Sequence, residues 1–171
     1  EIRNCDWSSD VCSSDLLEIY FEKEPAMAEK ITVDGRCHCG AIGVTAQVDP
    51  DLVMACHCSD CQKIGGGPYR AVAVSDAADF SITGTPREYI KVAESGNRRV
   101  QAFCGDCGTQ LYACDEQRQR FNIRTGFLNQ SETLVPAKHI FVSSALGWIT
   151  DIQNGDCLEK GPGSAETRFR R

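Results

Sequence analysis

Seven cysteines gathered in three short clusters constrain this sequence more than any other feature. The clusters read CHC at 37–39, CHCSDC at 56–61 and CGDCG at 104–108. Disulfides explain them poorly, because a C-x-C pair would close a small, strained ring, and a redox C-x-x-C normally lies in a βαβ context that is absent here. Thiolates at such spacings are typical metal ligands. We therefore predict that the following residues bind metal: Cys37, Cys39, Cys56, Cys58, Cys61, Cys104 and Cys107.

The cysteine count also bears on the cellular compartment. Eleven cysteines are many for 171 residues, and an odd number cannot all pair internally. The N-terminus lacks the basic stretch followed by an apolar one that marks a secretory signal. In a reducing compartment clustered cysteines bind metal more often than they form disulfides. We therefore expect a cytoplasmic protein. Outside the clusters, Cys114 is expected to be a buried small side chain and Cys157 a tail thiol.

Seven ligands divide naturally into four and three. A structural zinc site takes four protein ligands in a tetrahedron, whereas a catalytic site takes three and leaves a position for water or substrate. Soft thiolates favour zinc, with iron as an alternative at a four-thiolate site. Spacing alone leaves several groupings open. In one of them the middle cluster is the three-ligand site, and the four ligands come from the first and third clusters: Cys37, Cys39, Cys104 and Cys107.

Histidines near the clusters are the other possible ligands. His38 and His57 each lie beside cysteines, where either could be a fourth ligand or a proton shuttle. We expect instead that both are spacers, because neighbouring side chains diverge in extended backbone. His139 lies in an apolar stretch and is expected to be a satisfied core histidine.

Between the clusters the chain has the pattern of short β-strands divided by turn residues. Only residues 59–66, SDCQKIGG, are typical of a helical turn, with Ser59 as its cap and Gly65 at its end. Many short strands at near-regular spacing predict a mainly β, antiparallel domain with little helix. The strands are expected at residues 41–48, 69–74, 79–83, 88–92, 98–103, 109–114 and 121–126.

The two ends of the chain differ from the rest in composition. Residues 6–16 match the translation of a common sequencing-adapter oligonucleotide. We therefore expect residues 1–26 to be a disordered, non-native leader, with Met27 as the native start. The expected zinc-binding domain covers 27–162, and a polar, basic tail covers 163–171.

The charge of the chain gives no case for a polyanionic partner. Five of the six net negative charges lie in residues 1–24, so the rest of the chain is nearly neutral. No apolar run approaches the roughly 20 residues of a membrane span. We expect neither nucleic acid nor membrane as a partner. A nucleic-acid-binding zinc module is further disfavoured because the clusters carry acids, Asp60 and Asp106.

Several segments resemble the glutathione-dependent formaldehyde-activating enzyme family, which includes centromere-protein-V-like members. They are GRCHCGAIGV at 35–44, CHCSDCQKIGG at 56–66, FCGDCGTQL at 103–111, and KHIFV at 138–142 with Trp148. The resemblance runs from about residue 31 to about residue 162. It implies a β-tent fold of antiparallel sheets, a structural zinc held by the first and third clusters, and a catalytic zinc held by Cys56, Cys58 and Cys61.

The activity that the resemblance implies is addition of glutathione to formaldehyde, giving S-hydroxymethylglutathione. In the other direction this is a carbon–sulfur lyase reaction. A shared fold and cysteine pattern do not fix the substrate, so another thiol could replace glutathione and a similar small electrophile could replace formaldehyde. The alternative function is a non-catalytic, structural zinc-binding protein or interaction module. The oligomeric state stays open.

A thiol-binding site beside the middle cluster follows as a hypothesis. A metal-bound thiol is deprotonated at neutral pH, which makes it a nucleophile. Glutathione has two carboxylates, so cationic partners are expected near the middle cluster or in nearby strands, with ordinary surface charge as the alternative for each. Tyr69 is a further residue that could line the pocket. The cationic candidates are Lys63, Arg70 and Arg124.

Overall fold

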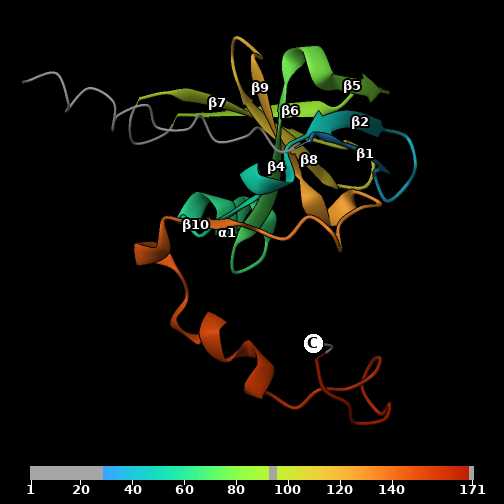
Figure 1. Ribbon diagram of the computed structural model, residues 1–171, viewed down its shortest axis with the longest axis vertical. Helices are drawn as coiled ribbons and strands as arrows, with labels where there is room; N and C mark the ends of the chain where they lie inside the picture. Colours follow the sequence, from blue (N-terminus) through green and yellow to red (C-terminus); the bar gives the residue numbers. More distant parts are fainter. Residues whose placement is uncertain (1–28, 93–95, 170–171) are drawn as a thin grey trace, which may run out of the picture.

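The structure is a computed structural model that describes residues 29–92 and 96–169. The predicted leader, with Cys5 and Cys12, lies outside the described residues, as do the last two residues of the predicted tail. Figure 1 shows a body of strands from which the C-terminal part of the chain extends. Among the described residues no helix is both long and apolar enough to cross a membrane.

Ten strands of the described chain form two sheets. The smaller sheet has the order β1-β2-β5, and all its pairs are antiparallel. Its strands are β1 (Ile31–Arg36), β2 (Gly43–Val48) and β5 (Phe80–Thr83).

The larger sheet has seven strands in the order β10-β3-β4-β9-β8-β7-β6. Its pairs are antiparallel except the parallel pair of β10 with β3. The strands are β3 (Met54–Cys56), β4 (Arg70–Asp76), β6 (Arg87–Val92), β7 (Arg98–Phe103), β8 (Gln110–Asp115), β9 (Arg120–Arg124) and β10 (Lys138–Ile140).

The hydrophobic core draws on both sheets. Val33 and Val48 of the smaller sheet and Leu111 and Ile123 of the larger one are fully buried in one cluster. Alternate residues of a strand point to opposite faces of its sheet. One face of the larger sheet therefore contributes to the core, and its other face is free to carry polar side chains.

Three aromatic rings join the sheets at one end of the core. Phe80 of β5 stacks on Phe121 of β9, with ring centroids 4.0 Å apart and an interplanar angle of 6°. Tyr112 of β8 meets both rings edge-on, at 5.3 and 5.2 Å. Such aromatic pairs stabilise by more than their buried area alone.

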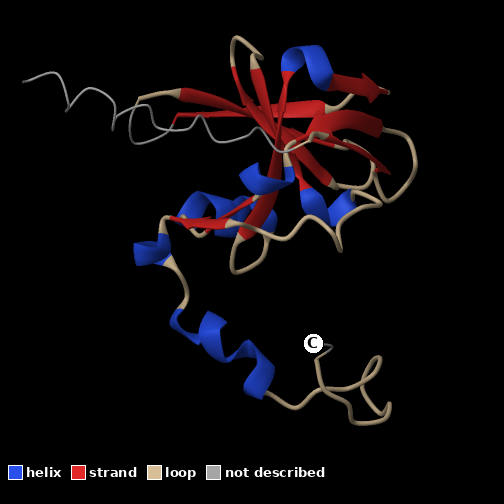
Figure 2. Cartoon of the chain, viewed as in Figure 1, coloured by secondary structure: helices blue, strands red, loops and turns tan. Residues whose placement is uncertain are grey.

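In the described residues, helical structure is limited to short segments between strands and after β10 (Figure 2). The single α-helix of the described residues is α1 (Ser59–Gly65). The 3₁₀ segments are η1 (Pro50–Leu52), η2 (Ala77–Asp79), η3 (Thr125–Phe127), η4 (Val142–Ser144) and η5 (Gly147–Asn154).

The mainly β fold class is confirmed, and each of the seven predicted strands corresponds to an observed one. The alternation of residues 41–48 becomes β2, and the segment 121–126 ends as a strand at Arg124 before η3 begins. Three strands lie outside the predicted set: β1, β3 and β10. Two of these have only three residues, too few for an alternating pattern. The tent arrangement of the sheets stays a prediction.

Candidate metal centres

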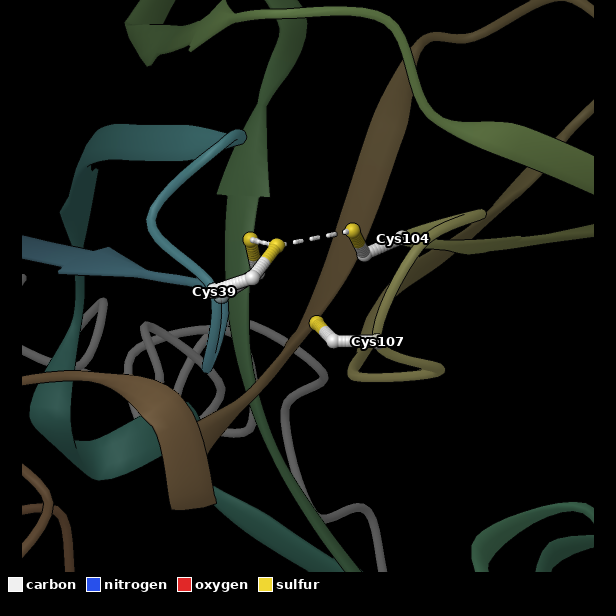
Figure 3. Close-up of side chains that lie close together, drawn as sticks. Cys39, Cys104 and Cys107 are labelled. Carbon is white, nitrogen blue, oxygen red and sulfur yellow. Dashed lines mark hydrogen bonds between the residues drawn. The ribbon is translucent and has the colours of Figure 1, made fainter.

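The four cysteines of the first and third clusters meet in space. Their sulfur atoms all lie within 4.8 Å of one another, although Cys39 and Cys104 are 65 positions apart in the sequence. Figure 3 shows the sulfurs of Cys39, Cys104 and Cys107 directed toward one another from the loops that follow β1 and β7. Cys37 completes the group and is 3% exposed. The fold thus assembles the ligand set of a four-thiolate centre.

The two loops hold their sulfurs in similar ways. The amide of Ile42 donates to the sulfur of Cys37 at 3.2 Å, while Cys37 N donates to Ile42 O at 2.9 Å. In the other loop Gly108 N donates to Cys104 O at 2.9 Å, and Gly108 has a φ of 75°. Because positive φ favours glycine, this residue lets the backbone turn back toward Cys107.

The local environment favours the thiolate form of Cys107. Its sulfur lies 3.2 Å from the hydroxyl oxygen of Thr109. Hydrogen bonds from that hydroxyl, and then from the backbone amides of Thr109 and Cys39, lower the pKa of Cys107 to about 5. Since a cysteine must be deprotonated to bind a metal ion, this loop is prepared to accept one.

The middle cluster forms a second group of three sulfurs, those of Cys56, Cys58 and Cys61, again within 4.8 Å of one another. Cys56 ends β3 and Cys61 lies in the first turn of α1. The sulfur of Cys58 caps this helix by accepting a hydrogen bond from Cys61 N at 3.4 Å. The predicted cap, Ser59, is therefore wrong by one position. Gly65 is the last residue of α1, as predicted, and Gly66, with a φ of 67°, caps this end of the helix.

The sulfur–sulfur distances in both groups fit a tetrahedral ion. Zinc–sulfur bonds of about 2.3 Å place the corners of a tetrahedron about 3.8 Å apart. The corresponding distances are 3.5 Å for Cys37–Cys39, 3.7 Å for Cys39–Cys104 and 3.5 Å for Cys56–Cys58. All the cysteines of the described residues are free, so neither group is a set of disulfides. Both donor sets therefore fit zinc.

In the second group, a hydrogen bond between Cys56 and Cys61 shifts the pKa values of these two thiols in opposite directions. A hydrogen bond from Cys61 lowers the pKa of Cys56, and the same bond, together with burial, raises the pKa of Cys61. Three thiolates so close together repel one another unless a cation lies between them. A divalent ion would take the place of the shared proton.

No histidine or carboxylate of the described residues joins either sulfur group. His57 is 3% exposed, and its Nε2 lies 3.0 Å from Nδ1 of His139. His38 is exposed, and its backbone amide donates to the hydroxyl of Thr109 at 3.1 Å. The expectation that His38 and His57 are not ligands agrees with this geometry. The expectation of a core histidine at position 139 is wrong, because His139 is exposed on β10, an edge strand of the larger sheet.

A cleft of about 300 Å³ opens beside the three sulfurs of the middle cluster. Its floor is the face of the larger sheet that does not contribute to the core, and α1 borders it through Asp60, Cys61 and Ile64. Two predicted cationic residues, Arg70 and Arg124, line it. They are only 6% and 7% exposed. The structure therefore brings both arginines to the middle cluster.

Arg70 and Arg124 share one neutral acceptor. Nη1 of Arg70 and Nη2 of Arg124 donate to Oε1 of Gln101, at 3.0 and 2.9 Å. Nε and Nη2 of Arg70 and Nε of Arg124 are buried with no hydrogen-bond partner among the described residues. Burial, and then the positive charge of Arg70, lower the pKa of Arg124 to about 9. Unpaired buried guanidinium groups are costly, so they point to an anion that the described residues do not supply.

Two other predicted residues lie outside this cleft. Lys63 is exposed and, like Tyr69, is not part of the cleft lining. Tyr69 instead contacts His57, with ring centroids 5.4 Å apart. Sequence reasoning missed Gln101, because nothing in the sequence shows that β7 carries it to the arginines of β4 and β9. The contact between His57 and His139 was missed for the same reason.

The chain is similar to several known proteins in sequence and, more weakly, in structure. Residues 32–144 match the sequence profile of the glutathione-dependent formaldehyde-activating enzyme family. An uncharacterized lyase of Schizosaccharomyces pombe is 28% identical over 79 residues, which are 46% of this chain and 55% of the relative. The chain thus spans about half the length of the curated relative that it matches. A crystal structure of a Rhodobacter sphaeroides protein covers 62% of this chain and 98% of its own, with 18% identity and a TM-score of 0.47.

Proposed function

Because the chain belongs to the glutathione-dependent formaldehyde-activating enzyme family, we propose that it is a zinc-dependent carbon–sulfur lyase. It adds glutathione, or another thiol, to formaldehyde or a similar small electrophile. The observation that supports this most is the group of Cys56, Cys58 and Cys61, which has no fourth protein ligand among the described residues and borders a cleft. The S. pombe relative, named as a lyase, supports the same reaction class.

The two sulfur groups would have different roles. In the proposed holoenzyme, the first and third clusters hold a structural zinc that joins the loops after β1 and β7. The middle cluster holds the second zinc, which when bound supplies a positive charge that keeps an incoming thiol deprotonated at neutral pH.

The buried arginines recognise the thiol substrate. Glutathione carries two carboxylates, and one of them takes the free N–H groups of Arg70 and Arg124. Gln101 holds both guanidinium groups in place through its side-chain oxygen. Because it is neutral, it leaves their two positive charges for the ligand. Charge-assisted bonds of this kind are stronger than neutral ones. Lys63, exposed on α1, is proposed to attract the anionic substrate from outside the cleft.

The addition needs no reagent other than the thiol and the aldehyde. The sulfur of the thiol forms a bond to the carbonyl carbon, and the electron pair of the carbonyl double bond moves to oxygen. The proton that leaves the thiol ends on that oxygen, so the product is a hemithioacetal. Apolar side chains of the cleft, including Val72 and Ile64, reduce access of water to this step.

The proposal is tested by the rate of exchange between formaldehyde and S-hydroxymethylglutathione, measured by exchange NMR with ¹³C-formaldehyde. The zinc-loaded protein is expected to exceed the spontaneous rate. The variant Cys58→Ser is expected to lose the acceleration, and Cys157→Ser, which changes a thiol outside both groups, is expected to keep it. Equal rates with and without the parent protein would contradict the proposal.

A further inference from the structure

The face of the larger sheet that carries the arginines continues beyond them as a row of charged side chains. In the strand registers Asp76 lies opposite Arg120, Asp115 opposite Arg99, and Arg99 opposite Lys91. Alternation along β7 places Arg99 on the same face as Gln101, two residues away and thus about 7 Å along the strand. The row therefore begins within reach of a ligand that occupies the arginine pair.

Most charges in this row already have partners. Arg120 pairs with Asp76 at 3.3 Å, and Lys91 pairs with Asp60. Arg99 and Asp115 differ, because neither has an ion-pair partner within 4.0 Å in the described part of the chain, although they are cross-strand neighbours. One carboxylate oxygen of Asp115 accepts a hydrogen bond from Gln119 N at 3.1 Å. The row thus contains one positive and one negative charge in neighbouring positions that form no ion pair within 4.0 Å in the described structure.

These two residues line a second cavity that adjoins the first. The second cavity has a volume of about 610 Å³, and both Arg99 and Asp115 line it. Arg99 and Asn122 line both cavities, so the two spaces meet at these side chains. A ligand that begins at the sulfurs of the middle cluster can therefore continue along the sheet to Asp115.

A neighbouring positive and negative charge match the two charges of an α-amino acid group. Extended over three residues, a peptide spans about 10 Å, so a tripeptide thiol with its sulfur at the middle cluster has two ends that reach in different directions. One end is a single carboxylate, which suits the arginine pair. The other end of glutathione is a γ-linked glutamate, which keeps both its ammonium and its carboxylate free.

We propose that Arg99 and Asp115 bind the α-amino-acid end of the thiol substrate. Arg99 takes its carboxylate and Asp115 takes its ammonium group, while Asn122 lies between this subsite and the cleft beside the middle cluster. The inference rests on the proposed function, and it restricts the substrate to thiols that carry a zwitterionic amino-acid group. A thiol without that group occupies only the cleft beside the middle cluster and leaves the subsite empty.

The test compares two thiols by calorimetric titration of the zinc-loaded protein: glutathione, and N-acetylcysteinylglycine, which lacks the γ-glutamyl end. The parent is expected to bind glutathione roughly tenfold or more tightly than the shorter thiol, since hydrogen bonds between charged groups are the strong ones. Arg99→Gln and Asp115→Asn are expected to remove this difference while binding of N-acetylcysteinylglycine stays unchanged. Unchanged binding of the shorter thiol also shows that the variants are folded.

Neighbouring residues supply matched controls. Arg98 and Glu116 pair with each other at 2.8 Å, lie next to Arg99 and Asp115 in the sequence, and line neither cavity. Arg98→Gln and Glu116→Gln are expected to keep the preference for glutathione. Equal affinity of the parent for both thiols, or an equal loss for both thiols in Arg99→Gln, overturns the subsite and leaves the proposed function standing. If the parent binds neither thiol, both proposals fail.

Discussion

Cys56 and Arg70 lie directly opposite each other on the antiparallel strands β3 and β4. The register therefore places a guanidinium group beside the middle sulfur group. The hydrogen bond with Cys56 and burial raise the pKa of Cys61, and the positive charge of Arg70 offsets part of this rise. Three thiolates exceed the charge of one divalent ion by one, and a fourth thiolate raises the excess to two. Arg70 and Arg124 carry two matching positive charges, so the surroundings favour entry of an anionic thiol.

Cys58→Ser is predicted to remove one zinc ion and leave the fold intact. Serine is a good helix cap, so the variant keeps the hydrogen bond to Cys61 N that begins α1. It loses a soft ligand of the middle group. Metal analysis is expected to give two zinc ions per chain for the parent and one for the variant, with unchanged circular dichroism. Collapse of the fold in this variant would instead favour a purely structural role for the middle group.

Cys104→Ser, in contrast, is predicted to destabilise the fold. Cys104 is 1% exposed and belongs to the core as well as to the four-sulfur group. Structural zinc sites contribute directly to folding free energy. We expect this variant to lose several kcal/mol of stability, or to be unfolded at 37 °C, as judged by thermal denaturation. A thermal midpoint equal to that of the parent would show that the four-sulfur group does not stabilise the fold.

The cysteine spacing predicted metal binding by all seven cysteines, because ligands close in sequence stay close in any fold and because four and three are the usual coordination numbers of zinc sites. It left several groupings open, because spacing does not show that Cys39 and Cys104, 65 positions apart, meet in space. The cleft was predicted only in part. Arg70 and Arg124 were predicted because they lie near the middle cluster or in nearby strands, and the strand register brings both to the cleft. Lys63 failed to reach the cleft because it lies two positions after Cys61 on α1, and residues two apart do not share a helix face. Gln101 could be found only once the strand order was known.

Gln101→Glu is predicted to stabilise the protein without thiol and to weaken thiol binding. A carboxylate between Arg70 and Arg124 would neutralise part of their buried charge, which the protein otherwise leaves for the ligand. We expect a gain of about 1 kcal/mol in the free energy of unfolding and a glutathione affinity about tenfold lower. Calorimetry and denaturant unfolding measure the two effects.

The matched control for this change is Gln47→Glu on β2. The side-chain amide of Gln47 donates to the exposed hydroxyl of Thr32 at 2.8 Å, and β2 belongs to the smaller sheet, not to the sheet that carries the arginines. It is expected to leave glutathione binding unchanged. If Gln101→Glu binds glutathione as tightly as the parent, the arginine pair does not hold the substrate carboxylate.

Arg118→Gln is predicted to reduce stability near neutral pH and to have no effect in acid. Arg118 donates two hydrogen bonds of 2.8 Å to Glu88, and these bonds lower the pKa of Glu88 below its ordinary value of 4.5. Because the folded state binds the proton less tightly than the unfolded state, the pair stabilises above pH 4.5 and loses this effect as pH falls through the lowered pKa. Both side chains are partly exposed, so the expected loss at pH 7 is below about 1 kcal/mol. Denaturant unfolding at pH 7 and pH 3 measures it, and an equal loss at both values would exclude the ion pair as its cause.

A zinc count combined with a glutathione titration of the purified parent protein tests most directly whether the middle cluster is a zinc site that binds a thiol. We expect two zinc ions per chain and saturable binding of glutathione. One zinc ion per chain, or no binding of glutathione at millimolar concentrations, would show that it is not.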